Sequence, residues 1–333
     1  MSRTAARLLI RYLLLAVGVV LLNFLIPRLL PGDPLNVGAA EGLDAGPPLP
    51  AVARAQLRGY YHLDEPLTGQ LVAYLGDLAR GDLGWSIARA APVRRLLLDR
   101  LPWTLGLLGT ALVLSAGAGT ALGLLAGWVP GSRRDRVLVT LTAALAALPE
   151  FLVAIGLLAV FAGTLRWFPL LGGQTLFAQY GADALGSWQG ALDVGRHLVL
   201  PATTLVLAGT AGFALIARDV TVGIRHAPWL TVARAKGLSE RQVALRHALP
   251  NLAGPLLTYF GLRLGAVFGG ALVVERVFNV PGLGLLAYEA IRTRDYPVLQ
   301  ALFLLASLGV LAVNCAVEFL YLRLARRQPA RYE

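Results

Sequence analysis

The sequence contains few charged residues and a single cysteine. Only 15% of its 333 residues are charged and 56% are hydrophobic, with a mean hydropathy of +0.64, whereas about 25% of the residues in a soluble domain are charged. This composition excludes an ordinary soluble domain and indicates a polytopic membrane protein of the all-α class. The one cysteine, Cys315, lies within an apolar run, which excludes a disulfide framework and a thiolate metal site.

The sequence also lacks the motifs of catalysis and metal binding. It has no G-x-x-x-x-G-K-[ST] phosphate loop, so we expect the chain to hold no ATP and no other cofactor. We expect no metal site, because no paired metal-ligand spacing joins the four histidines, which are His62, His197, His226 and His247. The sequence therefore predicts a protein that is not an enzyme and that takes its energy from another chain.

Six apolar runs of roughly 20 residues are long enough to cross a bilayer. They lie at 8–30, 104–127, 137–165, 198–217, 255–274 and 298–322. Trp103 and Trp128 flank the second run, as aromatic residues do at the surface of a membrane. The sequence therefore predicts six transmembrane helices.

Charge is distributed by side of the membrane. If the N-terminus is cytoplasmic, that side carries 16 basic residues and only four acids, which are Asp135, Asp219, Glu240 and Glu333, while the outer side carries 13 of each sign. The positive-inside rule then predicts a cytoplasmic N-terminus and a cytoplasmic C-terminus. The basic residues do not cluster with aromatic residues in the sequence, so the net charge of +11 does not indicate a nucleic-acid partner.

A secretory signal peptide is the alternative interpretation of residues 1–40. Three arginines, Arg3, Arg7 and Arg11, precede the first apolar run, as they do in signal peptides. The run is longer than the roughly 7 to 15 residues of a signal-peptide core. We therefore expect a first transmembrane helix that is retained.

A polar, basic segment from Trp229 to Asn251 separates two of the apolar runs. It reads W-L-T-V-A-R-A-K-G-L-S-E-R-Q-V-A-L-R-H-A-L-P-N. Gly237 suits a turn that needs a positive φ, and Ser239 to Gln242 have the S-x-x-Q pattern of a capping box. The sequence predicts a short helix, a glycine turn and a second helix between two membrane spans.

This segment resembles the cytoplasmic loop of permease subunits in binding-protein-dependent ABC importers. The matching residues are Ala233, Ala235, Gly237, Leu238, His247, Leu249, Pro250 and Asn251. Thr231 stands where that family often has Glu. The resemblance implies the type I importer permease fold, with a loop that couples to ATPases and comprises Trp229, Thr231, Ala233, Arg234, Ala235, Lys236, Gly237, Leu238, His247, Pro250 and Asn251. In this interpretation Ala233 and Ala235 form a small face that enters a groove on an ATPase.

Other segments resemble the dipeptide/oligopeptide branch of these permeases, which includes nickel importers. They are L-L-P-G-D-P from Leu29, L-D-E-P-L from Leu63, R-G-D-L-G from Arg80 and V-V-E-R-V-F-N-V-P-G-L-G from Val273. We interpret Asp33 as part of a helix-ending turn rather than as a ligand. The resemblance implies an importer of peptides or similar small solutes in the lipid bilayer of a bacterial or archaeal cytoplasmic (inner) membrane.

The same resemblance implies partners and a domain organisation. The expected partners are a second related permease, two cytoplasmic ATPase subunits that bind the ATP, and an extracytoplasmic substrate-binding protein. The expected organisation is a first transmembrane helix at 1–30 with a cytoplasmic N-terminus and an extracytoplasmic segment at 31–101. A core of five transmembrane helices at 102–323 then contains the coupling loop 218–254, and a cytoplasmic tail follows at 324–333.

Two sets of glycines repeat every four residues within apolar runs. A four-residue repeat places small residues on one helix face, where two backbones can approach closely. We expect these glycines to serve helix packing, either within the subunit or against a partner permease. They are Gly119, Gly123 and Gly127 in the second span, and Gly261, Gly265 and Gly269 in the fifth.

Three charged residues lie within expected spans, where an unpaired charge is costly. Arg263 stands where the resembling branch commonly has an uncharged polar residue. Our hypothesis is that Arg263 faces a translocation cavity, together with Glu150 and Glu318, and favours cargo that bears a carboxylate. The alternative is that Arg263 pairs with Glu150 or Glu318 for structural reasons.

A secondary transporter and a membrane-embedded enzyme are the alternatives to an importer permease. A secondary transporter would show inverted repeats or a chain of intramembrane carboxylates, and neither is evident in the sequence. A membrane-embedded enzyme would need a catalytic constellation, which the sequence lacks. Both classes therefore rank below the importer.

Overall fold

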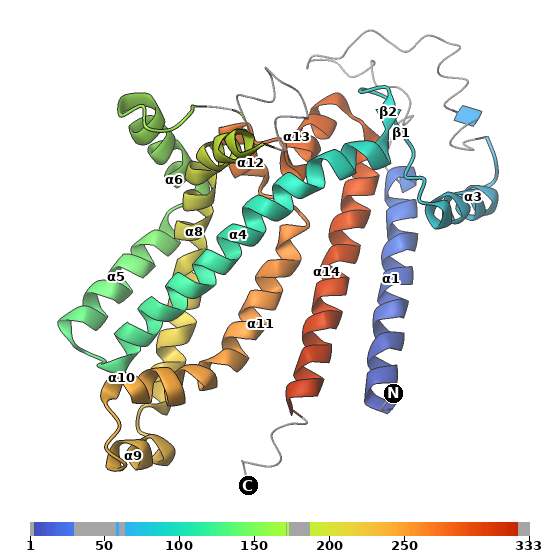
Figure 1. Ribbon diagram of the computed structural model, residues 1–333. Coiled ribbons are helices and arrows are strands. Elements are labelled where there is room, and N and C mark those ends of the chain that lie inside the picture. The colour runs from blue at the N-terminus through green and yellow to red at the C-terminus, as the bar shows by residue number, and fades with distance from the viewer. Residues whose placement is uncertain (1–2, 30–57, 60–63, 171, 173–186, 326–333) are drawn as a thin grey trace. The chain divides into compact units, whose positions relative to one another are not determined.

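The computed structural model describes residues 3–29, 58–59, 64–170, 172 and 187–325 (Figure 1). Asp33, His62 and the tail 326–333 lie outside the described residues. The described residues are mostly helical, and their strands form one two-residue antiparallel pair, β1 (Trp85–Ser86) and β2 (Ala91–Pro92). The prediction of the all-α class is confirmed.

Four of the described helices are long and apolar enough to cross a membrane, and two bent helix pairs raise the number to as many as six. The four are α1 (Arg3–Leu29), α4 (Val93–Trp128), α8 (Trp188–Ile224) and α14 (Tyr296–Ala325). One bent pair is α5 (Arg133–Ala147) with α6 (Glu150–Leu157) and the π-helical turn η1 (Leu158–Thr164). The other combines the helical stretch Glu240–Val267, which ends with α11 (Leu249–Val267), and α12 (Leu272–Phe278).

The third expected span, 137–165, is not one straight helix, and this prediction is corrected. The chain bends by 96° between α5 and α6. The cause is Pro149, because a proline disfavours helical backbone in the residue before it. Leu148 accordingly has φ −80° and ψ 124°, which ends α5.

The fifth expected span, 255–274, is also interrupted. The helix α11 ends at Val267, and the chain bends by 57° before α12 begins. Gly270 adopts φ +75° in the break. Gly269 therefore lies outside the helix, which corrects its assignment to a glycine row on one helix face, whereas Gly261 and Gly265 are buried in α11.

Two spans are longer than the apolar runs predicted. The helix α4 has 36 residues and α8 has 37, so each is roughly 55 Å long at 1.5 Å per residue, against about 30 Å of hydrocarbon. Each helix is therefore longer than the hydrocarbon layer is thick. The helix α4 also runs across the expected boundary at 101/102.

The chain divides into two compact units. The first comprises Met1–Thr104, Phe268–Leu272 and Pro281–Glu333, and the second comprises Leu105–Val267 and Val273–Val280. The first unit contains α1, α3 (Leu67–Arg80), the start of α4, α13 (Leu283–Thr293) and α14. Its buried core joins the start of α4 to α13 and α14 through Val93, Leu97, Leu283, Leu286, Ala290, Val298, Ala301 and Leu302.

In the first unit, α1 and α14 lie side by side and run antiparallel (Figure 1). Asn23 Nδ2 donates to the Gln300 backbone oxygen at 3.0 Å, and Gln300 Nε2 donates to the Asn23 backbone oxygen at 3.2 Å. Towards the other end, Arg11 forms an ion pair with Glu318 at 2.5 Å. These contacts place the beginning of α1 and the end of α14 at the same end of the pair.

The second unit packs α8 between α4, α5, α6 and α11. One buried cluster joins α4, α8 and α11 through Leu112, Phe213 and Val267. The Phe213 ring packs edge-on against Tyr259, with ring centroids 4.8 Å apart. The end of this unit where α4 and α8 finish carries the segment that separates α8 from α11.

Candidate functional site

The segment between α8 and α11 forms a short helix, a glycine turn and a second short helix. The first helix is α9 (Pro228–Ala235), which begins with a proline, a residue suited to a helix start because it needs no N–H partner there. Gly237 adopts φ +81° and reverses the chain. The helix α10 (Glu240–Val243) then starts at a capping box, in which Ser239 Oγ accepts from the Gln242 backbone N–H and Gln242 Oε1 accepts from the Ser239 backbone N–H.

This loop has its own hydrophobic core. Leu230 and Ala233 of α9 and Val243 of α10 are buried together, and Trp128 and Leu238 pack against them. Ala233 is only 3% exposed. The expectation that Ala233 belongs to an outward small face is therefore wrong, because residues 230 and 233 share the inner side of α9.

The outer side of α9 is exposed and largely apolar. Val232 is 53% exposed, and Trp229 is exposed as well. Thr231 and Ala235 are exposed on the same short helix, and Lys236 is exposed just after it. The loop therefore presents apolar and small side chains outward while its core holds the helix in place.

Polar contacts attach the loop to the end of α4. Arg234 Nε donates to Glu240 Oε1 at 2.9 Å, and Trp128 Nε1 donates to Glu240 Oε2 at 3.0 Å. The Arg234 guanidinium also lies 5.9 Å from the Trp128 ring centroid. Arg234 thus serves contacts inside the loop, and Glu240 connects both short helices to α4.

The exit from the loop packs against the membrane helices. The π-helical turn η3 (Ala244–Ala248) leads into α11, and Ala248 and Leu252 are buried with Leu124 of α4 and Ala217 of α8. Asn251 Nδ2 donates to the backbone oxygen of His247 at 2.6 Å. This side-chain bond adds a donor to the His247 carbonyl in the first turn of α11.

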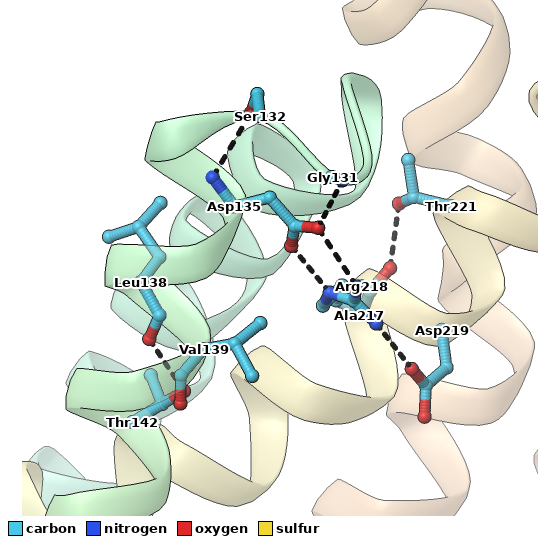
Figure 2. A network of polar contacts seen from close by, with 10 residues as sticks. All are labelled: Gly131, Ser132, Asp135, Leu138, Val139, Thr142, Ala217, Arg218, Asp219 and Thr221. Atoms are coloured by element: carbon cyan, nitrogen blue, oxygen red, sulfur yellow. Dashed lines mark hydrogen bonds and ion pairs between the residues drawn. The ribbon is translucent and has the colours of Figure 1, made fainter.

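A buried ion pair lies close to the same end of α8. Arg218 donates to Asp135 through Nε at 2.7 Å and through Nη2 at 3.0 Å (Figure 2). Asp135 is buried in the first turn of α5, where Oδ2 also accepts from the Gly131 backbone N–H at 2.8 Å. Ser132 Oγ caps the helix by accepting from the Asp135 backbone N–H at 3.1 Å. The network fixes the start of α5 to α8.

The first glycine row lies directly against the backbone of α8. A Cβ on Gly119 would be 2.6 Å from the Thr210 backbone oxygen, and one on Gly127 would be 2.7 Å from the Arg218 backbone oxygen. A Cβ on Gly123 would collide with the Ala214 backbone oxygen. All three positions need glycine because α4 and α8 approach backbone to backbone within this unit.

The three charged residues expected at a cavity have different surroundings. Arg263 is exposed on α11, and its Nη2 lies 3.9 Å from the position a Cβ would take on Gly209 of α8. Glu150 is exposed in the first turn of α6, where its negative charge interacts favourably with the positive end of the helix dipole. Glu318 belongs to the other unit, where it pairs with Arg11 and accepts from the Tyr12 hydroxyl at 3.1 Å. Glu318 therefore has partners of its own on α1.

Comparison with known proteins identifies the family. The sequence model of the family described as "binding-protein-dependent transport system inner membrane component" matches residues 119–328. The chain belongs to this family. A probable peptide ABC transporter permease protein, y4tP, of Sinorhizobium fredii is 35% identical over 298 residues, which are 90% of each chain. The glutathione transport system permease proteins GsiC of Escherichia coli (strain K12) and Salmonella typhi are each 36% identical over 303 residues, 91% of each chain.

The chain is thus a multi-pass inner membrane protein, the permease subunit of a binding-protein-dependent ABC importer, and not its ATPase subunit. The predictions of family, fold and importer function are confirmed. The permease works with ABC partner components, as its family does.

Sequence reasoning missed the Asp135–Arg218 pair of the permease. The pair joins residues 83 positions apart, so no local pattern reveals it. A usable signal existed in the charge count, because only four acids were expected on the cytoplasmic side. Three of these four, Asp135, Asp219 and Glu240, form ion pairs with arginines in the structure.

Proposed function

We propose that the permease forms half of a translocation pathway with a second related permease, and that its loop 229–251 couples this pathway to two cytoplasmic ATPase subunits. An extracytoplasmic binding protein delivers the cargo, which is a peptide or a similar small solute. Relatives named as peptide and glutathione permeases support this cargo class. The chain is a subunit of an importer in a bacterial or archaeal membrane.

The observation that carries the proposal is that one side of α9 is buried and the other is exposed. Its inner side is fixed by Leu230 and Ala233, while Val232 and Trp229 remain exposed on its outer side. An exposed apolar surface on a rigid short helix is typical of a protein contact site. Ala235 and Thr231 leave room for a partner surface to approach, so we place the ATPase against this side.

The loop is built to transmit a movement. Leu238 and Trp128 connect the core of α9 and α10 to α4, and Leu252 connects the exit helix to α4 and α8. Packed cores deform little, so a push on α9 moves the attached helices as a body. We infer that ATP-driven approach of the two ATPases switches the cavity between inward-facing and outward-facing states in this way.

The proposed topology places the loop and both chain ends in the cytoplasm. The ends of α4 and α8 and the starts of α5 and α11 meet near the loop, and this end carries arginines at 133, 134, 136, 218 and 225. Such an excess of basic residues favours the cytoplasmic side. The α1–α14 pair supports a common side for the two chain ends, because Arg11 meets Glu318.

Photo-crosslinking from position 235 tests the docking site. With a photoreactive amino acid at Ala235, we expect an adduct with the ATPase subunit in membranes that contain the complete importer. The control is the same amino acid at Trp188, which is exposed at the opposite end of α8. Absence of an ATPase adduct from every exposed position between 229 and 238, or an equal yield from position 188, would refute the docking proposal.

We further propose that Arg263 faces the translocation cavity. Its guanidinium reaches α8 at Gly209, where Nη2 lies 3.9 Å from the position that a Cβ would take. Because a charged hydrogen bond contributes about 1.5–3 kcal/mol, Arg263→Gln is expected to slow transport of carboxylate-bearing cargo roughly tenfold and to spare neutral cargo. Uptake of acidic and neutral peptides delivered by the cognate binding protein measures this. Equal rates for every cargo in the variant and in the wild type would exclude a role for Arg263 in selection.

A further inference from the structure

A pocket of about 650 Å³, including its open mouth, lies in the first unit. It is formed by the end of α1, one face of α3 and the beginning of α14. The polar and charged side chains of its lining are Arg28, Gln70, Tyr74, Asp77, Asp82 and Gln300, and Asp82 Oδ1 accepts from the Gly84 backbone N–H. None of these residues belongs to the coupling loop or to the proposed cavity.

One end of the pocket is suited to an anion. Arg28 is half-buried, with Nε donating to Gln70 Oε1 at 2.8 Å and Nη1 donating to the Phe24 backbone oxygen at 2.8 Å. Its guanidinium also stacks 3.7 Å from the Phe24 ring centroid. Within the described part of the chain no carboxylate pairs with Arg28, and Nη2 has no acceptor. A half-buried charge without a counter-charge is costly, and a bound anion would offset that cost.

The Tyr74 hydroxyl adds a donor at the same end. Its oxygen is buried beside the Gln300 side chain and forms no hydrogen bond of ordinary geometry with the described residues. Buried polar atoms are nearly always partnered, so an unpartnered one that lines a pocket indicates a ligand atom. Burial raises the pKa of the Tyr74 hydroxyl above its ordinary value, so the group stays protonated and can donate.

The next turn of α3 presents the opposite charge. Asp77 follows Tyr74 by three positions and so lies on the same helix face, and it also lines the pocket. No described cation pairs with its carboxylate. The pocket therefore offers an anion-binding end and a cation-binding end, which together fit a zwitterion.

The surroundings of the pocket indicate a lipid as the source of that zwitterion. The helix α3 turns Gln70, Tyr74 and Asp77 into the protein while its opposite side leaves Val72 and Leu75 exposed. A helix with a polar inner side and an exposed apolar side is stable where the apolar side meets a membrane surface. The apolar stretch of α1 ends at Leu25, three residues before Arg28, which places the guanidinium at the level of lipid head groups.

We propose that this pocket holds the head group of a phospholipid with a primary ammonium group, of the phosphatidylethanolamine type. Arg28 and Tyr74 bind the phosphate, and Asp77 binds the ammonium. The acyl chains lie along the exposed apolar residues of α1, among them Leu21, Leu22 and Leu25. The bound lipid fixes α3 to the ends of α1 and α14 and does not depend on where the ATPases dock.

Native mass spectrometry of the purified complete importer tests the site. The delipidated complex is titrated with phosphatidylethanolamine and with phosphatidylcholine of the same chains, whose quaternary ammonium cannot donate a hydrogen bond. We expect Arg28→Gln to weaken retention of phosphatidylethanolamine roughly tenfold. We expect Asp77→Asn to abolish the preference for phosphatidylethanolamine over phosphatidylcholine. Should Arg28→Gln fail to fold, Tyr74→Phe, which removes one oxygen atom, is expected to weaken retention in its place.

Arg11→Gln is the matched control, because Arg11 lies on the same helix but is exposed at its other end. It should retain lipid as the wild type does. Retention unchanged in the Arg28 or Tyr74 variant, or an unchanged preference in the Asp77 variant, overturns the proposal. So does displacement of the lipid by a dipeptide, which would make the pocket a cargo site. Crosslinking of position 235 to the ATPase is expected to be the same in every pocket variant, so the two proposals can fail separately.

Discussion

Gly123→Leu is expected to leave almost no folded permease in the membrane. A Cβ at this position would collide with the backbone oxygen of Ala214 and would stand 2.6 Å from the Ala217 Cβ and 2.9 Å from the Arg218 nitrogen. Two of these three obstacles are backbone atoms of α8, which cannot turn aside as a flexible side chain can. Overpacking of a core typically lowers the free energy of unfolding by about 1–3 kcal/mol. We expect a larger decrease here, because α4 and α8 must separate along their length to admit the side chain.

The measurement is the amount of monodisperse permease complex recovered in mild detergent, together with its unfolding temperature. Gly117→Leu provides the matched control, because Gly117 lies on the same helix and a Cβ there would meet nothing within 4 Å. We expect the Gly117 variant to be recovered like the wild type. Equal recovery of both variants would show that the close approach of α4 and α8 is dispensable.

The apolar runs that form the four long helices and the two bent pairs were accessible from sequence, because hydrocarbon thickness sets a minimum apolar length. The bend at Pro149 was not inferred, although the proline was visible, because apolar runs on both sides concealed the break in the helix. The extra length of α8 was also missed. Its added turns carry charged residues such as Arg196 and Arg218, which a search for apolar runs excludes.

The loop between α8 and α11 shows which local features can be predicted. Gly237 and the Ser239 capping box depend on backbone geometry and on neighbours within three residues, so the sequence indicates them directly. The inward position of Ala233 depends on Val243 and on Trp128, which is more than 100 residues away. Which side of a short helix is buried is decided by such distant partners, and a resemblance to a motif does not supply them.

Asp135→Asn is expected to destabilise the permease by about 2–4 kcal/mol. The Asp135 side chain is 4% exposed and that of Arg218 is 26% exposed. Water therefore has little access to the pair and cannot solvate the arginine well once the carboxylate is gone. The asparagine keeps the shape but removes the buried counter-charge of Arg218, whose other ion pair is with the exposed Asp219 carboxylate. The Arg234–Glu240 pair is the natural comparison, because its side chains are 36% and 59% exposed and a pair of that kind contributes about 0.2–1 kcal/mol.

A double-mutant cycle separates the pair from the two residues taken alone. Unfolding of the purified permease complex is followed for Asp135→Asn, Arg218→Gln and the combined variant, and in parallel for Glu240→Gln, Arg234→Gln and their combination. Because the buried partners touch, we expect a coupling energy above about 1 kcal/mol for the first cycle and below about 0.5 kcal/mol for the second. The buried pair joins α5 to α8 close to the loop, so its loss should also lower transport per ATP hydrolysed while position 235 still crosslinks to the ATPase. Equal coupling in the two cycles would mean that burial does not set the strength of the Asp135–Arg218 connection.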